Sequence, residues 1–435
     1  MKTTGLPVTT VERDGALSHF AVHISPIYYL MLPFYCLIPR PETLQILQAA
    51  VLASAVIPLW MLGRHHGLHP CLRAAVCVLL LVYPSYAGGA SYDIHENCFL
   101  TPLILWLFYG IDRKKISITA LSAALTLMVK EDAPVYVAVV GLYLLLRSAL
   151  QKDKWGRRVG AALTAGAIFW FLCATAYLSG KGDGVMTGRY QNFMYDGSGS
   201  LRSVVKAILL CPMKAVFECV DAEKQVFLAL TVLPLLGLPL MTRRYERYLL
   251  LIPYLLVNLM SDYQYQHNIM YQYTFGSAAC LFYLTVVNLA DIKTSWKQTA
   301  LLAAALSIGA VCFFGKVFPV AKRQIVNCAR YEAYYDSQRE LLDTIPEDAS
   351  VAATTFYTVY LSRRSELYDV RYGARAHILG CDYVVIKTGE TKTFQAYETG
   401  EKSGKEAFTQ MLLENGFQQE RVLPEVLEIY RKSGN

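Results

Sequence analysis

The chain has 435 residues, of which 54% are hydrophobic and 17% are charged, and its mean hydropathy is +0.31. This composition excludes an ordinary soluble protein and predicts several bilayer spans. The formal net charge of +7 follows from basic loops described below, so it indicates no nucleic-acid partner. Most of the 11 cysteines lie in apolar runs and none forms a Cys-x-x-Cys pair, which predicts buried thiols without disulfide or metal chemistry.

The first predicted domain is an external N-terminal segment, residues 1–41. Residues 1–20 are polar and carry no signal peptide. Residues 23–38 are apolar and rich in tyrosine, but they contain two prolines and are shorter than the roughly 20 residues that span a bilayer. They predict a helix that lies at the membrane interface.

Ten apolar runs follow and form a predicted transmembrane domain over residues 42–315. Several of these runs are short, which predicts tilted helices or helices enclosed by their neighbours. A long external loop is expected at 180–225, where residues 201–220 predict an amphipathic surface helix broken near Pro212. The ten expected spans are residues 42–62, 72–88, 98–111, 116–130, 134–150, 159–179, 226–241, 248–261, 271–290 and 298–315.

Basic residues are concentrated in every second loop, and the alternate short loops near 89–97, 130–133 and 262–270 hold only Lys130. By the positive-inside rule the basic loops face the cytoplasm, so the alternate loops, the 180–225 loop and the C-terminal region face outward. The first long span then enters from outside, which predicts an external N-terminus and a further span upstream of this chain. The basic loop residues are Arg64, Arg73, Arg113, Lys114, Lys115, Arg147, Lys152, Lys154, Arg157, Arg158, Arg243, Arg244, Arg247, Lys293 and Lys297.

The composition becomes polar near residue 316, which marks a third predicted domain, residues 316–435. Alternating strand and helix patterns predict a small extracytoplasmic α/β domain. We expect helices at 322–345, 356–363 and 405–415, and strands at 350–354, 366–370 and 382–387, with extended segments toward Tyr430.

Several motifs resemble those of a known family: His23–Leu30, Asp93-x-His95-Glu96, Val129–Asp132, Asn268–Tyr273 and Pro346–Val351. Through them the chain is similar, over nearly its whole length, to bacterial predicted membrane proteins of domain-of-unknown-function 2079. That family distantly resembles the GT-C membrane glycosyltransferases, which take a sugar from a polyprenyl-phosphate donor on the outer face. The resemblance implies a polytopic α-helical fold of about ten transmembrane helices with external interfacial helices and a small C-terminal α/β domain.

The GT-C resemblance also implies a catalytic carboxylate ahead of the interfacial helix. In those enzymes this helix is often marked Pro-Leu-Tyr-Tyr, which is similar to residues 26–29 here. The first span and most of the loop that carries the carboxylate are lacking from this chain, so Glu12 and Asp14 are the candidates that are left. Asp14 would be the general base that deprotonates an acceptor hydroxyl, and His19 and His23 beside the helix would bind substrate.

Asp93, His95 and Glu96 lie at one outward-facing junction between apolar runs, where ionisable residues are functional by default. Two carboxylates with an imidazole suit either a divalent cation, Mg²⁺ or Mn²⁺, or an acid–base pair. The alternative interpretation is a polar loop that only caps a span.

Lys130, Glu131 and Asp132 lie at a second outward-facing junction. In the GT-C resemblance Glu131 or Asp132 would bind a metal or the sugar, and Lys130 would meet a phosphate oxygen. A self-neutralising cluster that caps the next helix is the alternative. Because the spans 98–111 and 116–130 are short and consecutive, we expect the two motifs to be neighbours.

Further candidates lie on the same predicted face. Arg189 in the long loop is suited to bind a pyrophosphate, because a guanidinium can donate two parallel hydrogen bonds to phosphate oxygens. Tyrosines and glutamines near residues 263–273 suit sugar hydroxyls and ring stacking, although tyrosine is also common at membrane interfaces. The substrate-binding candidates from this region are His267, Gln272 and Tyr273, whereas the cytoplasmic His65, His66 and His69 lack an acidic or cysteine partner nearby and are expected to be structural.

The sequence therefore predicts a GT-C-like integral membrane glycosyltransferase with a polyprenyl-phosphate sugar donor, which enters laterally among the membrane lipids. A multi-span transporter or flippase is the main alternative, since such proteins use intramembrane charges for ion coupling. No paired repeat of the kind common in transporters is evident. An inactive, truncated membrane protein is the third interpretation.

Overall fold

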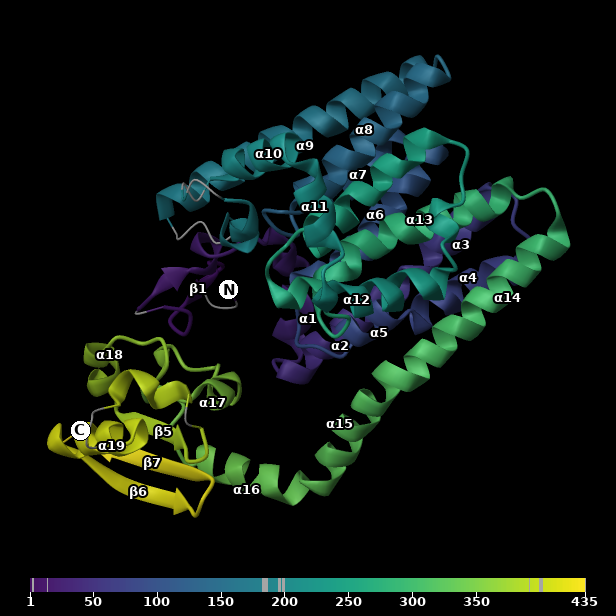
Figure 1. Ribbon diagram of the computed structural model, residues 1–435. Coiled ribbons are helices and arrows are strands. Elements are labelled where there is room, and N and C mark those ends of the chain that lie inside the picture. Colours follow the sequence, from purple (N-terminus) through teal and green to yellow (C-terminus); the bar gives the residue numbers. More distant parts are fainter. Residues whose placement is uncertain are drawn as a thin grey trace. The chain divides into compact units, whose positions relative to one another are not determined.

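The structure, a computed structural model, describes residues 1, 4–13, 15–181, 187–194, 197, 200–390, 392–398 and 402–434. The chain forms two units (Figure 1). We call Val22–Arg323 the helical unit, and Met1–Ala21 with Gln324–Asn435 the terminal unit. This grouping differs from the expected domain boundaries, because the first 21 residues group with the C-terminal residues.

Many helices of the helical unit begin at a proline, whose fixed φ and missing N–H suit the first helical turn. Pro41, Pro70, Pro84, Pro134 and Pro212 all occupy this position. The first half of the unit contains η2 (Pro26–Leu30), α1 (Leu32–Leu37), α2 (Pro41–Ser54), α3 (Val56–His65), α4 (Pro70–Val82), α5 (Pro84–Ala90), η3 (Glu96–Phe99), α6 (Leu100–Asp112), α7 (Ile116–Leu127), α8 (Pro134–Leu150) and α9 (Lys154–Lys181).

The second half of the helical unit is more broken, since Pro234, Pro239 and Pro253 interrupt its apolar runs. Its elements are η4 (Thr187–Phe193), α10 (Leu201–Leu210), α11 (Pro212–Cys219), α12 (Ala222–Val232), η5 (Leu233–Leu235), η6 (Leu238–Leu240), η7 (Tyr245–Leu251), η8 (Tyr254–Leu259), η9 (Gln264–His267), η10 (Gln272–Thr274), α13 (Phe275–Asp291), α14 (Ser295–Cys312) and η11 (Phe313–Val317). α15 (Phe318–Arg330) then continues into the terminal unit.

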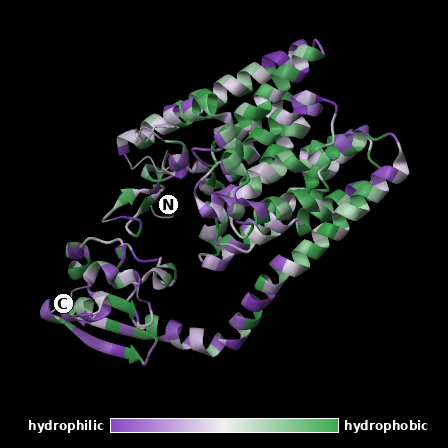
Figure 2. Cartoon of the chain, in the orientation of Figure 1, coloured by the Kyte–Doolittle hydropathy of each residue, from purple (hydrophilic) through white to green (hydrophobic). Residues whose placement is uncertain are grey.

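Four helical stretches in the described residues are long and apolar enough to cross a bilayer: Pro41–His65, Lys154–Lys181, Gln272–Asp291 and Ser295–Arg330. α4 and α5 make a fifth if the pair, bent by 52°, counts as one span. Most of these helices are apolar along their length, and hydrophilic residues gather at the connections (Figure 2). The other expected spans are shorter helices, such as α7 and α8, or are broken by proline.

α13 is the central helix of the helical unit. Its side chains from Phe275 to Leu289 are all buried, as expected for a helix that is apolar on every side. The predicted interfacial segment 23–38 forms two short helices, η2 and α1, and the predicted surface helix breaks into α10 and α11 at Pro212, as expected.

The terminal unit contains a mixed five-stranded sheet in the order β4-β3-β5-β7-β6. β3 lies parallel to β4 and β5, whereas β7 pairs antiparallel with β5 and β6. The expected strands and the expected helices at 356–363 and 405–415 are present, whereas the expected helix 322–345 is divided near Tyr331 into α15 and α16. The N-terminal hairpin joins the sheet through a hydrogen bond from Thr10 Oγ1 to the Leu367 carbonyl. The elements are β1 (Val8–Thr9), β2 (Leu17–Ser18), η1 (His19–Ala21), α16 (Glu332–Leu342), β3 (Val351–Ala353), α17 (Thr355–Tyr360), β4 (Leu367–Asp369), α18 (Arg375–Gly380), β5 (Tyr383–Lys387), η12 (Lys392–Tyr397), α19 (Gly404–Glu414), β6 (Phe417–Leu423) and β7 (Leu427–Lys432).

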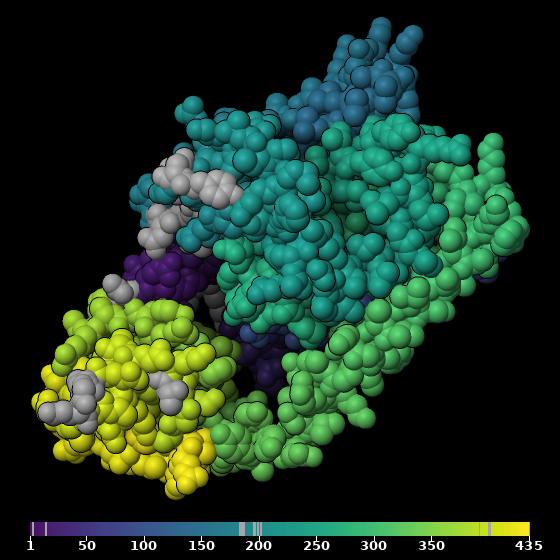
Figure 3. All heavy atoms as spheres, viewed as in Figure 1, coloured from purple at the N-terminus to yellow at the C-terminus, as the bar shows by residue number. Residues whose placement is uncertain are grey.

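α8 and α9 form a hairpin that projects beyond the other helices of the helical unit (Figure 3). Glycines allow the two backbones to approach, as small residues do between membrane helices. A Cβ atom added at Gly160 would lie 2.8 Å from the carbonyl oxygen of Gly141 and 2.9 Å from the backbone nitrogen of Leu145. Both contacts are with backbone atoms, so the helices would have to separate.

We expect Gly160→Ala to destabilise the protein by about 1–3 kcal/mol, the usual effect of overpacking. Gly166→Ala on the same helix is the matched control, because a Cβ there meets no atom within 4 Å. Alanine favours helix by about 1 kcal/mol over glycine, so this control should be neutral or stabilising. Thermal unfolding in detergent measures both variants, and equal melting temperatures would contradict the close approach.

Candidate functional site

A buried ion pair joins the two charged motifs of the sequence, Asp93–Glu96 and Lys130–Asp132. Lys130 follows α7 and Glu96 begins η3, and Lys130 Nζ lies 2.9 Å from Glu96 Oε1. The two side chains are 2% and 4% exposed. A buried charge is strongly unfavourable unless an opposite charge pairs with it, so the contact fixes the two loops together. The expectation that the motifs are neighbours is confirmed.

The second carboxylate oxygen of Glu96 has partners as well. The Tyr28 hydroxyl donates a hydrogen bond of 2.7 Å to Glu96 Oε2, and it accepts one of 3.1 Å from the Glu96 backbone N–H. His95 Nδ1 lies 3.1 Å from the same Oε2. Burial opposes ionisation of Glu96, but Lys130 and His95 hold its pKa well below the usual range. We infer that Glu96 is an ionised anchor of the site.

Glu131 attaches the segment before η2 to the same cluster. Its side chain is buried, with Oε1 2.9 Å from His23 Nδ1, and Oε2 accepts a hydrogen bond of 3.0 Å from the Ile24 N–H. Burial works against its charged form, whereas His23 and Lys130 lower its pKa below the usual value. Glu131 therefore positions His23, and both oxygens are occupied.

Asp132 differs from its two acidic neighbours. It is half-buried, and no hydrogen bond to its carboxylate from a described side chain occurs. Burial raises its pKa, and repulsion from Glu131 adds to this effect, while Lys130 and Arg189 act in the opposite direction. A carboxylate with a raised pKa and without a hydrogen-bonded partner is suited to accept a proton.

Arg189 interacts electrostatically with Asp132, and its guanidinium contacts aromatic rings. Its Cζ is 5.5 Å from the ring centre of Tyr263 and 5.4 Å from that of Tyr273, distances typical of cation–π contacts. The Arg189 carbonyl also accepts a hydrogen bond of 2.9 Å from the Asp262 N–H. The structure thus brings Arg189 and Tyr273, two of the predicted substrate-binding residues, near the cluster.

A row of tyrosines continues from this point, and we call it the tyrosine row. Ring centres are separated by 6.0 Å for Tyr273 and Tyr263, 4.9 Å for Tyr263 and Tyr265, 4.6 Å for Tyr265 and Tyr271, and 4.7 Å for Tyr271 and Tyr92. His95 lies at the near end, 6.3 Å from Tyr273. The row is therefore continuous with the charged cluster.

Of the other predicted residues, His267 and His19 have partners outside the charged cluster. His267 is buried and its Nε2 lies 3.8 Å from Glu223 Oε2 of α12. His19 belongs to the terminal unit, where its Nδ1 lies 2.8 Å from Glu12 Oε1. Gln272 is buried next to Tyr273, and its Oε1 has no hydrogen-bond partner among the described residues. Asp14 lies outside the described residues.

The predicted cation site, Asp93 with His95 and Glu96, is not assembled. In the part of the chain that the structure describes, no three His, Cys, Asp or Glu side chains are grouped to hold a metal ion. Asp93 is exposed, and Glu96 is already neutralised by Lys130. These residues therefore do not fit a resident divalent cation.

Two residues that the sequence did not single out support the site. Gln48 of α2 is 1% exposed; its amide donates to the Tyr92 carbonyl at 3.1 Å and accepts from the His95 N–H at 2.9 Å. Asn258 of η8 donates to the Tyr273 carbonyl at 3.2 Å. Each is a polar amide within an apolar run, and this pattern could have marked both residues as candidates in the sequence. Tyr28 lies in a quoted motif, but its bond to Glu96 was not foreseen.

We expect the stability of the protein to fall between pH 6.5 and pH 4 because of His95. Burial lowers the pKa of His95 from 6.5 to about 4. The unfolded chain therefore binds a proton in this range that the folded chain does not, and stability decreases as the pH falls. His95→Gln should flatten the decline, measured as melting temperature against pH. His69→Gln, at an exposed histidine, is the control, and a decline that His95→Gln leaves unaltered would contradict the assignment.

Comparison with known protein families gives the same family that the sequence motifs resemble. The model of a family described as "Predicted membrane protein (DUF2079)" matches residues 5–422. A comparison with curated proteins finds no match. Together with the long apolar helices, the family match identifies a membrane protein and confirms that part of the predicted resemblance. The chain belongs to the DUF2079 family of predicted membrane proteins.

Proposed function

We propose that this protein is a GT-C-like membrane glycosyltransferase that uses a polyprenyl-phosphate-linked sugar on the extracytoplasmic face. The observation that carries the proposal is the electrostatic interaction between Asp132 and Arg189. The pKa of Asp132 is raised, the charge of Arg189 acts on this carboxylate, and Arg189 itself lies over the rings of Tyr263 and Tyr273. Transfer of a sugar from a phosphate needs a base for the acceptor and a cation for the departing phosphate.

In the proposed reaction Asp132 accepts the proton of an acceptor hydroxyl. The acceptor oxygen forms a bond to the anomeric carbon of the sugar, and the bond from that carbon to the phosphate oxygen breaks. The phosphate leaves with the electron pair, and Arg189 stabilises its charge through paired N–H donors. Lys130 does not contact the phosphate in this scheme, because its ammonium group is paired with Glu96. The proton remains on Asp132 until product leaves.

The tyrosine row supports a saccharide as the ligand. Aromatic rings offer flat apolar faces with polar hydroxyl tips, which suit the mixed surface of a sugar. Tyr92 and Tyr263 are 39% and 38% exposed, so their rings are available for contact. Tyr273 is buried beside Arg189 and connects the row to the proposed phosphate position.

The proposal includes the membrane arrangement. We propose that the shorter apolar helices complete about ten spans together with the longer ones, by tilting or by local thinning of the bilayer. The loops at Glu96 and Lys130, and the sheet of the terminal unit, would then face outward, in keeping with the basic loops on the other side. The donor would enter from the membrane lipids. Mg²⁺ or Mn²⁺ has no role in the reaction proposed here, and the assay includes both metals to test that.

Asp132→Asn should lower turnover at least about 100-fold, the range lost with a general base. Purified protein in proteoliposomes is given radiolabelled polyprenyl-phosphate sugars with Mg²⁺, Mn²⁺ or EDTA, and transfer of label is measured. Arg189→Gln should lower turnover strongly as well. Asp348→Asn removes an exposed carboxylate of the terminal unit and should leave turnover unchanged.

Two outcomes would contradict the proposed glycosyltransferase activity. Turnover that survives Asp132→Asn would exclude this residue as the base. Donor that binds without transfer in every condition, or that moves across the bilayer unchanged, would favour the transporter or flippase. The buried charges are equally compatible with ion coupling, so flux of label is measured in the same vesicles.

A further inference from the structure

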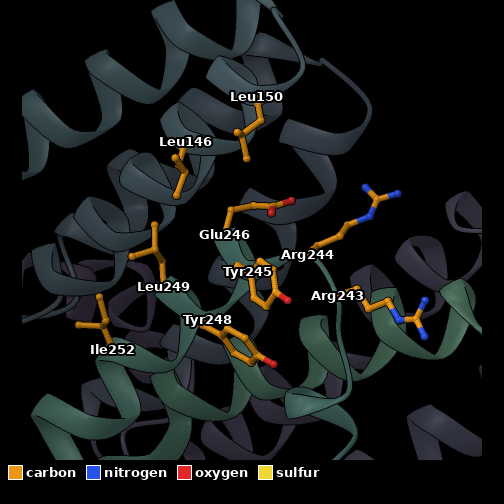
Figure 4. A pocket seen from close by; sticks show the side chains of 9 residues that line it. All are labelled: Leu146, Leu150, Arg243, Arg244, Tyr245, Glu246, Tyr248, Leu249 and Ile252. Atoms are coloured by element: carbon orange, nitrogen blue, oxygen red, sulfur yellow. The ribbon is translucent and has the colours of Figure 1, made fainter.

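A hollow lies away from the charged cluster, between α8 and η7. It is an open hollow with a volume of about 680 Å³, within the size range of small-ligand sites. Its lining is divided by polarity: Leu146, Leu249 and Ile252 lie at one end, and Arg243 and Arg244 at the other (Figure 4). A ligand that fills such a hollow must itself be amphipathic.

The basic end carries charge that the protein does not neutralise. Arg247, next to the hollow, is satisfied internally, since its Nη1 lies 2.6 Å from Asp291 Oδ2. Arg244 shares that carboxylate only weakly, at 3.7 Å from its Nε. Arg243 is exposed and forms no ion pair with any described residue. Two guanidinium groups are therefore available for an anion, and guanidinium suits phosphate.

A carboxylate lies between the two ends of the hollow. Glu246 is 8% exposed, and Figure 4 shows its side chain extended into the space between Leu150 and Arg244. No ion pair to Glu246 is formed within the described part of the chain. A carboxylate that is buried among apolar side chains favours a cationic partner.

Tyr248 fixes the loop that carries the arginines. Its hydroxyl donates hydrogen bonds to the carbonyls of Leu240, at 3.0 Å, and of Thr242, at 3.3 Å. Tyrosine beside arginine is typical of the boundary between membrane and water. Basic pockets between membrane helices bind lipid head groups.

We propose that this hollow binds an aminophospholipid, a lipid that carries a phosphate and a primary amine. Arg243 and Arg244 bind the phosphate, Glu246 accepts hydrogen bonds from the ammonium group, and the acyl chains cover Leu146, Leu249 and Ile252. A choline head group has no N–H to donate, and a glycerol head group has no positive charge. The inference is independent of the proposed enzyme activity.

The experiment is native mass spectrometry of the full chain with equimolar phosphatidylethanolamine, phosphatidylglycerol and phosphatidylcholine. We expect phosphatidylethanolamine to be retained about tenfold over phosphatidylcholine, the factor that one charge-assisted hydrogen bond provides. Arg243→Gln with Arg244→Gln should reduce retention of phosphatidylethanolamine about tenfold. Arg157→Gln with Arg158→Gln, an exposed arginine pair on α9, is the matched control.

Glu246→Gln tests the contact with the ammonium group separately from the contact with the phosphate. It should abolish the preference for phosphatidylethanolamine over phosphatidylglycerol while phosphatidylglycerol is still retained. Water-soluble glycerophosphoethanolamine in excess should not displace the lipid, since the acyl chains contribute to binding. Should the double arginine variant unfold, Arg243→Gln alone replaces it, because that side chain is exposed. Equal retention of the three lipids, or retention unaffected by the arginine substitutions, would overturn the proposal.

Discussion

The ion pair between Glu96 and Lys130 is the contact on which the candidate site depends. It joins the loop before α6 to the loop after α7, and both charges are buried. Tyr28 connects η2 to the same carboxylate, and Glu131 connects His23 through a second bond. Three segments that are distant in sequence therefore meet at one pair of charges. Without the pair, each buried charge would favour a rearrangement that exposes it to water.

The acidic residues of the helical unit divide into two kinds according to their partners. Glu96 and Glu131 have both oxygens engaged, and so does Asp112, which lies 2.8 Å from Arg147 Nη1 and 2.9 Å from His66 Nε2. Such carboxylates hold elements together. Asp132 is half-buried without a hydrogen bond from a described side chain, and its raised pKa follows from this setting. The presence or absence of partners for the carboxylate oxygens thus distinguishes the supporting carboxylates from Asp132, the one proposed to react.

The sequence was sufficient to predict that the two charged motifs of the site lie close together. Charges at the ends of short consecutive apolar runs had to lie near each other, and this predicted the contact of Glu96 with Lys130. The contribution of Gln48 depends on where α2 packs, which no local pattern specifies. Proline signals located the break between α10 and α11, yet other prolines left several expected spans shorter than a bilayer. The grouping of residues 1–21 with the C-terminal sheet was missed, because pairing across more than 300 residues leaves no periodic signal.

The most direct test of this account is a double-mutant cycle of Glu96→Gln and Lys130→Met, measured as the free energy of unfolding in bicelles. Each single substitution leaves a buried group unpaired and should destabilise the protein by about 3–5 kcal/mol. The double variant removes both charges, so it should be more stable than the sum of the single effects predicts, by about 0.5–3 kcal/mol. Additive effects would show that the two charges do not interact, and would contradict the account.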